Sequence, residues 1–339
     1  MEKFLETIEK TIINLNQRDV SKDKHRGRSK TLYKLAGDDI FDDRMKTIQL
    51  INDKYENANT KRSYYETLVT ITGYNEYYLE SVKFNDEKNE IRLNNVLSDN
   101  ELNNWMNLKE LKEVPQKVRN EILKKFNKVV WKKSIEEFND IPKKRQQHYL
   151  QLILNYLTLL INIYHPLRLD YYNVKIKYLN DEIEKNDNYV LIKNGYSELH
   201  MNYYKNSDSY SKTNIQRINF TVNIEINNFI ELYTLLYNKR PEYVSYRHVD
   251  NELNIRPAKD RHYYGIALNN LFEKYSGKKI TIRLIRKIHE SEFIQSDKYK
   301  TMTNAEKTKQ HMKLLHSQSV AIMGYNMLKP NNVSTFVNS

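Results

Sequence analysis

Apolar residues recur every three or four positions along much of the chain, the spacing that gathers them on one face of a helix. The first segment shows this clearly, because Phe4, Ile8, Ile12 and Leu15 form one stripe. Short stretches with the same spacing follow between residues 29 and 79. The pattern therefore predicts an amphipathic helix at the start of the chain and a small helical domain after it.

A polar stretch interrupts this pattern near its beginning. Residues 21–30, with the sequence SKDKHRGRSK, carry dense charge and no apolar side chain. Such a stretch predicts a flexible basic arm or an ordinary solvated linker. If it is an arm for phosphate groups, the candidate DNA-contacting residues are Lys24, Arg26 and Arg28.

A second polar stretch, residues 81–104, is rich in asparagine. It predicts a linker between domains, with a boundary near residue 100. The whole chain of 339 residues is long enough for two domains of ordinary size, each with its own core.

Beyond this boundary, residues 152–164 (LILNYLTLLINIY) form the most apolar run of the chain. Asn155 and Asn162 interrupt the run, which is also shorter than the roughly 18 residues that a membrane span requires. We therefore expect a buried helix and no membrane-spanning segment. Pro166 follows the run and predicts a turn just before Arg168.

The apolar spacing changes after this turn. Three segments between residues 174 and 223 are rich in β-branched and aromatic residues and are separated by polar turns, which predicts a small antiparallel sheet. Helical spacing then resumes, with Thr281 as a possible cap of one helix and Thr303 with Glu306 in the spacing of a capping box. The predicted fold is mainly α-helical with a small antiparallel β-sheet, an α+β fold.

Composition narrows the chemistry. The chain has 7 glycines and 6 prolines, which favours helices over sharply turning structure. It has no cysteine, so disulfides, a thiolate nucleophile and cysteine-based metal sites are excluded, and an intracellular location is expected. The first ten residues lack the apolar core of a secretory signal.

The charge balance points to a polyanionic partner. The 55 Lys and Arg residues exceed the 43 Asp and Glu residues, giving a net charge of +12 and a pI near 9.3. Such a protein favours nucleic acid as its partner, although a solvated surface in a Lys- and Asn-rich chain is a simpler reading. Candidate DNA-contacting residues outside the first basic stretch are Arg62, Lys143, Lys144 and Arg145.

Four separate segments carry residues suited to phosphate chemistry. An arginine follows the helix and its proline turn, and a lysine lies in a polar turn of the predicted sheet. Two arginines stand three apart on a later helix, and a histidine precedes a tyrosine by nine positions in LLHSQSVAIMGYN. These residues are Arg168, Lys205, Arg283, Arg286, His316 and Tyr325. Each residue alone fits ordinary packing or capping, and only their joint order indicates phosphate chemistry.

The series resembles the catalytic domain of the tyrosine recombinases, the phage-integrase family. The resemblance runs from about residue 104 to 329, and the helical region before it is similar to the DNA-clamping core-binding domain of that family. It implies a core-binding domain over residues 1–100, a catalytic domain over 101–330 and a tail over 331–339. It also implies cutting and rejoining of double-stranded DNA through a 3′-phosphotyrosyl intermediate, by a homotetramer on paired DNA sites.

The resemblance makes Tyr325 the nucleophile, His316 its helper, and Arg168 and Arg286 the ligands of the scissile phosphate. Physical chemistry agrees with these roles. Planar guanidinium groups match paired phosphate oxygens, and a phenol with a pKa of about 10 needs a base or nearby cations to react at neutral pH. No metal, nucleotide or other small-molecule ligand is then required.

The proton donor to the leaving oxygen is less defined. The resemblance assigns this role to Lys205, while Lys212 lies in the same polar stretch and Lys193 is a more distant alternative. Arg283 stands where the family commonly has a histidine. This departure leaves open which group takes the proton of the tyrosine.

Other functions fit parts of the pattern. A type IB topoisomerase or a telomere resolvase shares the arginine, lysine and tyrosine chemistry. A non-catalytic DNA-binding protein would keep the fold without strand transfer, and an RNA-binding protein would also explain the charge. A metal site is disfavoured, because His311 and His316 are poorly spaced for one helical face and no carboxylate pair lies near them in sequence. The habits of the family suggest a virus, plasmid or other mobile element as the source.

Overall fold

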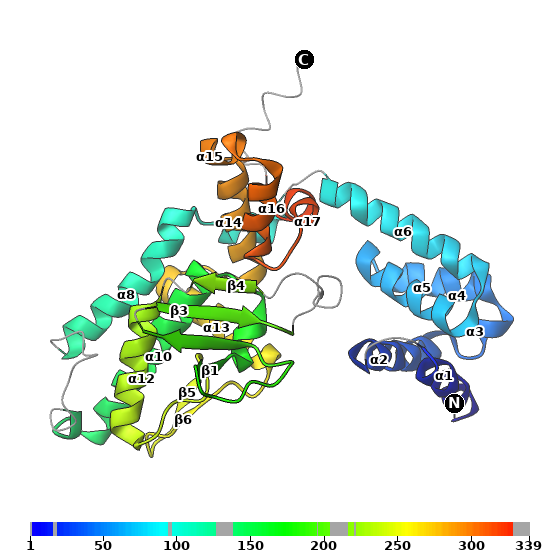
Figure 1. The fold of residues 1–339 in the computed structure, drawn as a ribbon. Helices are drawn as coiled ribbons and strands as arrows, with labels where there is room; N and C mark the ends of the chain where they lie inside the picture. The colour runs from blue at the N-terminus through cyan, green and yellow to red at the C-terminus, as the bar shows by residue number, and fades with distance from the viewer. Residues whose placement is uncertain are drawn as a thin grey trace. The chain divides into compact units, whose positions relative to one another are not determined.

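The structure is a computed structural model that describes residues 2–15, 19–93, 97–126, 138–194, 196–203, 216–219 and 222–327. The chain divides into two compact units, Met1–Val96 and Leu97–Ser339 (Figure 1). The division falls close to residue 100, where the asparagine-rich stretch suggested a boundary. The fold is mainly helical with small sheets, as the sequence predicted.

The described part of the first unit is helical. Its helices are α1 (Glu2–Ile13), α2 (Asp19–Ala36), α3 (Asp39–Asp42), α4 (Arg44–Lys54), α5 (Ala58–Thr72) and α6 (Asn75–Leu93). Two fully buried tyrosines tie these helices together. The hydroxyl of Tyr65 donates to the carbonyl of Ile48 at 3.1 Å, and that of Tyr77 donates to the carbonyl of Ile40 at 2.8 Å. Their polar ends are therefore satisfied inside an apolar core.

The prediction of a flexible basic arm over residues 21–30 is wrong. These residues form part of α2, an 18-residue helix. Lysine and arginine are good helix formers, and the following Leu32 is fully buried and anchors the helix in the core. Ser29 is also buried, and its hydroxyl donates to the carbonyl of His25. Dense charge here marks the outer face of a packed helix.

Most of the asparagine-rich stretch that the structure describes is helical. Residues 81–93 continue α6, and Phe84 in this segment is buried. Residues 99–104 form α7 (Asp99–Asn104), which begins with a capping box between Ser98 and Glu101. A helix can begin without an apolar stripe when its first turn is capped in this way.

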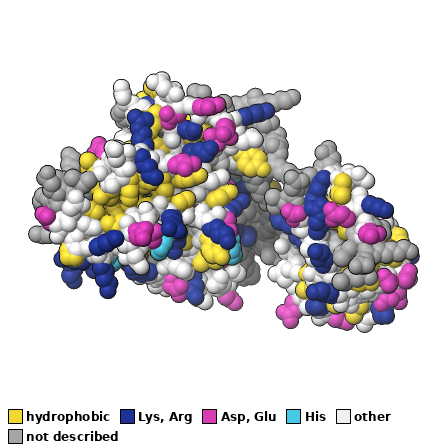
Figure 2. Space-filling model, turned by 90° about the horizontal axis from the view of Figure 1, so that it is seen from below, with side chains coloured by type: hydrophobic (Ala, Val, Ile, Leu, Met, Phe, Trp, Pro, Cys, Tyr) yellow, Lys and Arg dark blue, Asp and Glu magenta, His cyan; other side chains and the backbone are white. Residues whose placement is uncertain are grey.

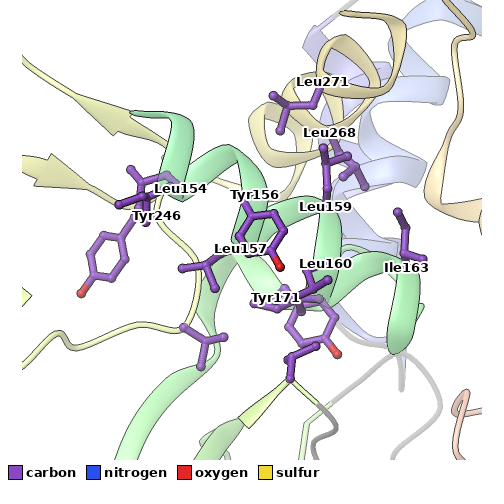
Figure 3. Close-up of a cluster of buried hydrophobic side chains, with 14 of the residues drawn as sticks. Leu154, Tyr156, Leu157, Leu159, Leu160, Ile163, Tyr171, Tyr246, Leu268 and Leu271 are labelled. Carbon is purple, nitrogen blue, oxygen red and sulfur yellow. The ribbon is translucent and has the colours of Figure 1, made fainter. Parts of the chain in front are cut away.

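The second unit surrounds one long buried helix. Its helices are α7, α8 (Leu108–Phe126), α10 (Lys143–Tyr164), the 3-10 helix η1 (Leu169–Asn173), α12 (Asn223–Tyr237), α13 (Arg261–Ser276), α14 (Ile282–Ile294), α15 (Asp297–Thr301), α16 (Asn304–Met312) and α17 (Gln318–Gly324). Figure 3 shows Leu154 and Leu159 of α10 in one cluster with Tyr246 and Leu268. The apolar run is thus a core helix, and no helix in the described ranges has the length and apolar character to cross a bilayer.

The sheet lies against this helical core. Its strands are β1 (Lys175–Tyr178), β2 (Tyr189–Lys193), β3 (Tyr196–Met201) and β4 (Gln216–Asn219), hydrogen-bonded in that order. The β2–β3 and β3–β4 pairs are antiparallel, as predicted. A short pair, β5 (His248–Val249) with β6 (Ile255–Arg256), was not predicted.

The expectation of a wholly antiparallel sheet is wrong for β1, which pairs parallel to β2. The ammonium group of Lys175 donates to a carboxylate oxygen of Asp187 at 2.8 Å, and that of Lys177 donates to the carbonyl of Glu182. These bonds hold Glu182 and Asp187 of the connecting segment beside β1. The segment therefore returns to the residues where β1 begins, and β2 begins there too. The sequence indicated the polar turn, but it did not indicate whether the strand after the turn runs parallel or antiparallel to β1.

Candidate active site

One face of α14 supplies the centre of the site. The hydroxyl of Thr281 caps this helix by accepting from the backbone N–H of Leu284 at 3.2 Å, as the sequence suggested. Arg286 and Glu290 are four residues apart, which places them on one face of the helix. Their residual exposures are 1% and 2%, so two opposite charges are buried together. Arg283, three residues earlier, is exposed.

Arg286 is held by three acceptors from two segments of the chain. Its Nη1 donates to the carbonyl of Pro166 at 2.9 Å. Its Nη2 donates to the carbonyl of Leu314 and lies 2.6 Å from both that oxygen and Nδ1 of His316. Burial lowers the pKa of this guanidinium, yet arginine stays charged at any physiological pH. The cation is therefore fixed by the turn after α10 and by the turn before α17.

The tautomer of His316 follows from these contacts. A guanidinium can only donate, so Nδ1 of His316 must accept with its lone pair. Nε2 then carries the ring proton and donates to Oε1 of Glu290 at 2.8 Å. Burial lowers the pKa of His316, and the nearby charge of Arg286 lowers it further while the bond to Glu290 opposes the shift. His316 is consequently a neutral imidazole at pH 7.

Glu290 joins a second histidine to the site. Its Oε2 lies 2.8 Å from Nδ1 of His311, whose Nε2 lies 3.3 Å from the hydroxyl of Tyr299. Burial alone would raise the pKa of Glu290, but hydrogen bonds from the two imidazoles lower it to about 2. The carboxylate is therefore ionised and accepts on both oxygens.

Tyr325 stands immediately after α17. Its ring stacks on that of His316 with centroids 4.9 Å apart and an interplanar angle of 18°. The guanidinium carbon of Arg286 lies 5.2 Å from the centre of the same ring. Ser291 of α14 fixes the backbone here, because its hydroxyl donates to the carbonyl of Tyr325 at 2.9 Å and accepts from the N–H of Met327 at 2.8 Å.

The surroundings of Tyr325 favour its ionised form. Burial raises the pKa of the phenol, but the charge of Arg286 and a hydrogen bond from it act in the opposite direction, with further contributions from Arg168 and Arg283. The net pKa lies below the usual value of a tyrosine. Cations around a phenol are one of the two ways in which it becomes nucleophilic at neutral pH.

Arg168, like Arg286, has a buried guanidinium donor without a partner in the described part of the chain. It lies between α10 and η1, where Pro166 ends the helical path, and it is half-buried. Among the residues that the structure describes, its Nη1 is buried without a hydrogen-bond partner, and so is Nε of Arg286. Buried unsatisfied donors are rare and call for a ligand or another explanation. Both belong to the arginines that the sequence assigned to phosphate.

Asp170 is a member of this region that the sequence analysis missed. Its side chain is 7% exposed, and its Oδ1 lies 3.7 Å from Nη2 of Arg261. Burial raises its pKa, while Arg261, Arg168 and Arg286 oppose the shift. A carboxylate two residues after Arg168 in a tight turn was the available signal.

The candidate proton donors are only partly placed. Lys205 and Lys212 lie outside the described residues, in the connection between β3 and β4. Lys193, the distant alternative, is at the end of β2 and forms an ion pair with Glu198 at 2.9 Å. Its hydrogen bond to Glu198 is the main cause that raises its pKa. A lysine paired in this way is a poor proton donor, which disfavours Lys193.

Three of the candidate DNA-contacting residues of the first unit are engaged within it. Arg26 binds the carboxylate of Glu9, with its Nε 2.8 Å from Oε2. Arg28 donates to the carbonyl of Ser63, and Arg62 forms an ion pair with Glu66 at 3.1 Å. Lys24 is exposed.

The basic residues at the start of α10 are exposed: Lys143, Lys144 and Arg145. The guanidinium of Arg145 lies over the ring of Phe126 and donates to the carbonyl of Lys125 at 3.0 Å. On the face shown in Figure 2, Lys and Arg side chains are interspersed with Asp and Glu. A single dense basic patch is therefore not visible on that face.

A cavity of about 830 Å³ lies beside the two segments whose carbonyl groups bind Arg286. Its lining includes Pro166, His289, Glu290 and Leu314, but neither Tyr325 nor Arg168. The two backbone carbonyls that hold Arg286 thus belong to residues of its wall. The cavity is not the place where the phenol and the free guanidinium donors meet.

The sequence did not reveal that one carboxylate, Glu290, lies between His311 and His316 in the fold. Ligand atoms of the three residues lie within 4.8 Å of one another, which could suit a metal ion. A metal on Nε2 of His316 would leave the ring proton on Nδ1, facing the donors of Arg286. The three groups fit a metal only if Arg286 leaves this position, so they fit a hydrogen-bonded network better.

Comparison of the chain with protein-family models, curated proteins and solved structures finds no match.

Proposed function

We propose that this chain is a tyrosine recombinase, which cuts and rejoins double-stranded DNA through a 3′-phosphotyrosyl intermediate. The observation that carries the proposal is the position of Tyr325. Its ring stacks on that of His316 and lies close to the guanidinium of Arg286, which comes from α14. The pKa of its phenol is lowered. The buried unsatisfied donors of Arg168 and Arg286 supply the complementary feature, a place for phosphate oxygens.

The proposed cleavage step is a displacement at phosphorus. The phenolate oxygen of Tyr325 forms a bond to the phosphorus, and the bond to the 5′ oxygen breaks. Negative charge grows on the phosphoryl oxygens, where Arg168 and Arg286 donate. Losing one such preorganised donor typically costs about 3 to 4 kcal/mol of transition-state stabilisation. Rejoining is the reverse step, in which a 5′ hydroxyl attacks the ester.

His316 is better suited to an electrostatic role than to that of a base. Its Nδ1 lone pair accepts from Arg286, and its Nε2 proton is donated to Glu290. It therefore has no free lone pair for the phenolic proton in this arrangement. We propose that Tyr325, which is half-buried, loses its proton to water and that the surrounding guanidinium groups stabilise the anion.

The leaving 5′ oxygen needs a proton from another group. Lys205 is proposed for this role on the basis of the family resemblance, with Lys212 as the alternative. Assembly as a homotetramer on paired sites and DNA clamping by the first unit are part of the same proposal. A type IB topoisomerase would share the chemistry, and relaxation of supercoiled DNA by a monomer would identify it.

A trapping assay tests the proposal. The protein is incubated with duplexes that carry a bridging phosphorothiolate or a nick, and covalent adducts are separated on a denaturing gel. We expect an adduct with the wild-type chain and none with Tyr325→Phe. Tyr263→Phe is the matched control, because Tyr263 is 53% exposed and lies outside the site, so its adduct should be unchanged. An adduct that persists in Tyr325→Phe would contradict the assignment of the nucleophile.

A further inference from the structure

Six side chains form one continuous chain of hydrogen bonds through the site. It runs from Gln318 to Tyr299 at 3.3 Å, then to His311 at 3.3 Å and to Glu290 at 2.8 Å. From Glu290 it continues to His316 at 2.8 Å and to Arg286 at 2.6 Å. The members come from α14, α15, α16, α17 and the turn between the last two.

The chemistry of the ends and the centre fixes the direction of the bonds at Gln318, at Arg286 and at Glu290. The amide nitrogen of Gln318 can only donate, and so can the guanidinium of Arg286. The ionised carboxylate of Glu290 can only accept. Each imidazole therefore donates to one carboxylate oxygen of Glu290, and a neutral His311 ring accepts from the hydroxyl of Tyr299.

We propose that Glu290 is a positioning residue for strand cleavage, because it is the buried counter-ion that holds His316 in the tautomer whose Nδ1 accepts from Arg286. This inference rests on the proposed function and deepens it. Glu290 itself touches neither Tyr325 nor a phosphate in this arrangement. It acts through His316, which transmits the position of the carboxylate to the guanidinium and to the stacked phenol.

Charge compensation explains why an anion is needed at this point. A buried cation without a partner is strongly destabilising. Among the described carboxylates whose charge acts on Arg286, Glu290 is linked to it through one residue, because the ring of His316 bonds to both side chains. Asp170 also acts on Arg286, but burial raises the pKa of Asp170 and makes it the weaker anion of the two.

The same turn of α14 also determines the place of the nucleophile. Ser291 follows Glu290 and bonds the backbone on both sides of Asn326, through the carbonyl of Tyr325 and the N–H of Met327. The ring of Tyr325 rests on His316, whose plane is set by Glu290 and Arg286. Displacing the carboxylate would therefore move both the ring and its cation.

The tautomer of His316 can be measured without DNA. Nitrogen-15 NMR of the imidazole rings distinguishes a protonated nitrogen from one with a lone pair, and a His316→Gln sample identifies the signal. At pH 7 we expect a lone pair on Nδ1 and a proton on Nε2. A proton on Nδ1 at this pH would overturn the proposal, whatever the chain does to DNA.

The effect on cleavage is tested with Glu290→Gln, which keeps the shape of the side chain and removes its charge. We expect single-turnover cleavage to fall about 10- to 100-fold, the range found when a partner orienting a functional imidazole is removed. DNA affinity should stay within about twofold, because Glu290 is buried and does not face the solvent. Glu292→Gln, two residues further along the same helix, is the matched control with an unchanged rate.

The pH profile separates positioning from a merely structural role. The charged and titratable groups facing His316 are Arg286 and Glu290 from α14, His311 from α16 and Tyr325. A proton on Nδ1 of His316 breaks its bond to Arg286, so cleavage should fall on the acid side. Because Glu290 raises the pKa of His316, Glu290→Gln should move this acid limb to lower pH. His311→Gln should keep an acid limb, since His316 is still present.

Two results of the cleavage experiments would also overturn the proposal. One is a cleavage rate for Glu290→Gln within about twofold of wild type, since the charge would then do nothing for the reaction. The other is a lower rate with the acid limb unmoved, which is the result of a general loss of structure. If the wild-type protein forms no adduct at all, the proposed function fails instead. The NMR measurement would still test the hydrogen bonds between Glu290, His316 and Arg286.

Discussion

Arg286 and Arg168 have the same expected role, but their surroundings contrast. Arg286 is on α14, and its two Nη atoms bond to the carbonyl oxygens of Pro166 and Leu314 and to His316. Arg168 lies in a turn beside the sheet and has a buried Nη1 with no partner in the described ranges. Both Nη atoms of Arg286 are thus engaged before any ligand arrives and its Nε is left over among the described residues, whereas Nη1 of Arg168 is left for a ligand. In the proposed mechanism, Arg286 has both a structural and a catalytic role, and Arg168 has mainly a catalytic one.

The largest expected effect is that of Arg286→Ala. It leaves two carbonyls and the lone pair of His316 without their donor and leaves the Glu290 anion without its cation. Removing one partner of a buried charge pair costs about 3 to 5 kcal/mol of folding stability. We expect that loss in urea unfolding, together with a cleavage rate reduced by at least about 100-fold. An unchanged free energy of unfolding would contradict the structural role that distinguishes Arg286 from Arg168.

Arg168→Ala should separate activity from stability. The rate of cleavage should fall by about 100- to 1,000-fold, because a phosphate donor is lost. Stability should change by less than about 1 kcal/mol, because the substitution removes a buried donor that has no partner. Urea unfolding and single-turnover cleavage on the same samples check this. A loss of stability equal to that of Arg286→Ala would contradict the distinction.

Acid should weaken the fold through two histidines, the buried His165 and the half-buried His289. Burial lowers the pKa of His165 and of His289 to about 4, so the folded chain holds them neutral while the unfolded chain protonates them from about pH 6.5 downward. Their contribution to stability is present above pH 6.5 and is lost as pH falls toward 4. At about 1.4 kcal/mol per pKa unit, each histidine accounts for a few kcal/mol.

The pH dependence is checked by urea unfolding between pH 7 and pH 4. His289→Leu should reduce the loss of folding stability between pH 7 and pH 4, because the substituted chain has one fewer group to protonate on unfolding. His262→Gln is the control, since His262 is exposed and should leave the slope as it is. A slope that does not respond to His289→Leu would show that other groups govern the acid transition.

The smallest expected effect is that of metal removal. Because a metal on His316 would require Arg286 to leave, treatment with EDTA should change the cleavage rate by less than about twofold. Metal content of the purified chain, measured in parallel, shows whether anything was removed. Restoration of lost activity by Zn²⁺ would show that Glu290, His311 and His316 bind a metal in the active chain.

Much of the helical framework was readable from the sequence, because it depends on local signals. The capping of α14 by Thr281 and of α16 by Thr303 with Glu306 was predicted from spacing, and the structure confirms both. The buried helix ending before Pro166 was also predicted. Such features are encoded within a few residues of the chain, so no knowledge of the fold is needed to find them.

The network around Glu290 could not be predicted in the same way. Glu290 lies 21 and 26 positions from the two histidines that it joins, and these distances in sequence carry no periodic signal. The parallel direction of β1 and the helix over residues 21–30 were missed for a related reason. Both depend on contacts, of Lys175 with Asp187 and of Leu32 with the core, that composition does not reveal.

The most direct test of the account is to identify the residue that carries the nucleotide. A trapped adduct is digested with nuclease and protease, and mass spectrometry locates the remaining nucleotide on the peptide. The account predicts a 3′-linked nucleotide on Tyr325. A nucleotide on any other residue, or no adduct with duplexes of randomised sequence under conditions in which the chain binds them, would contradict it.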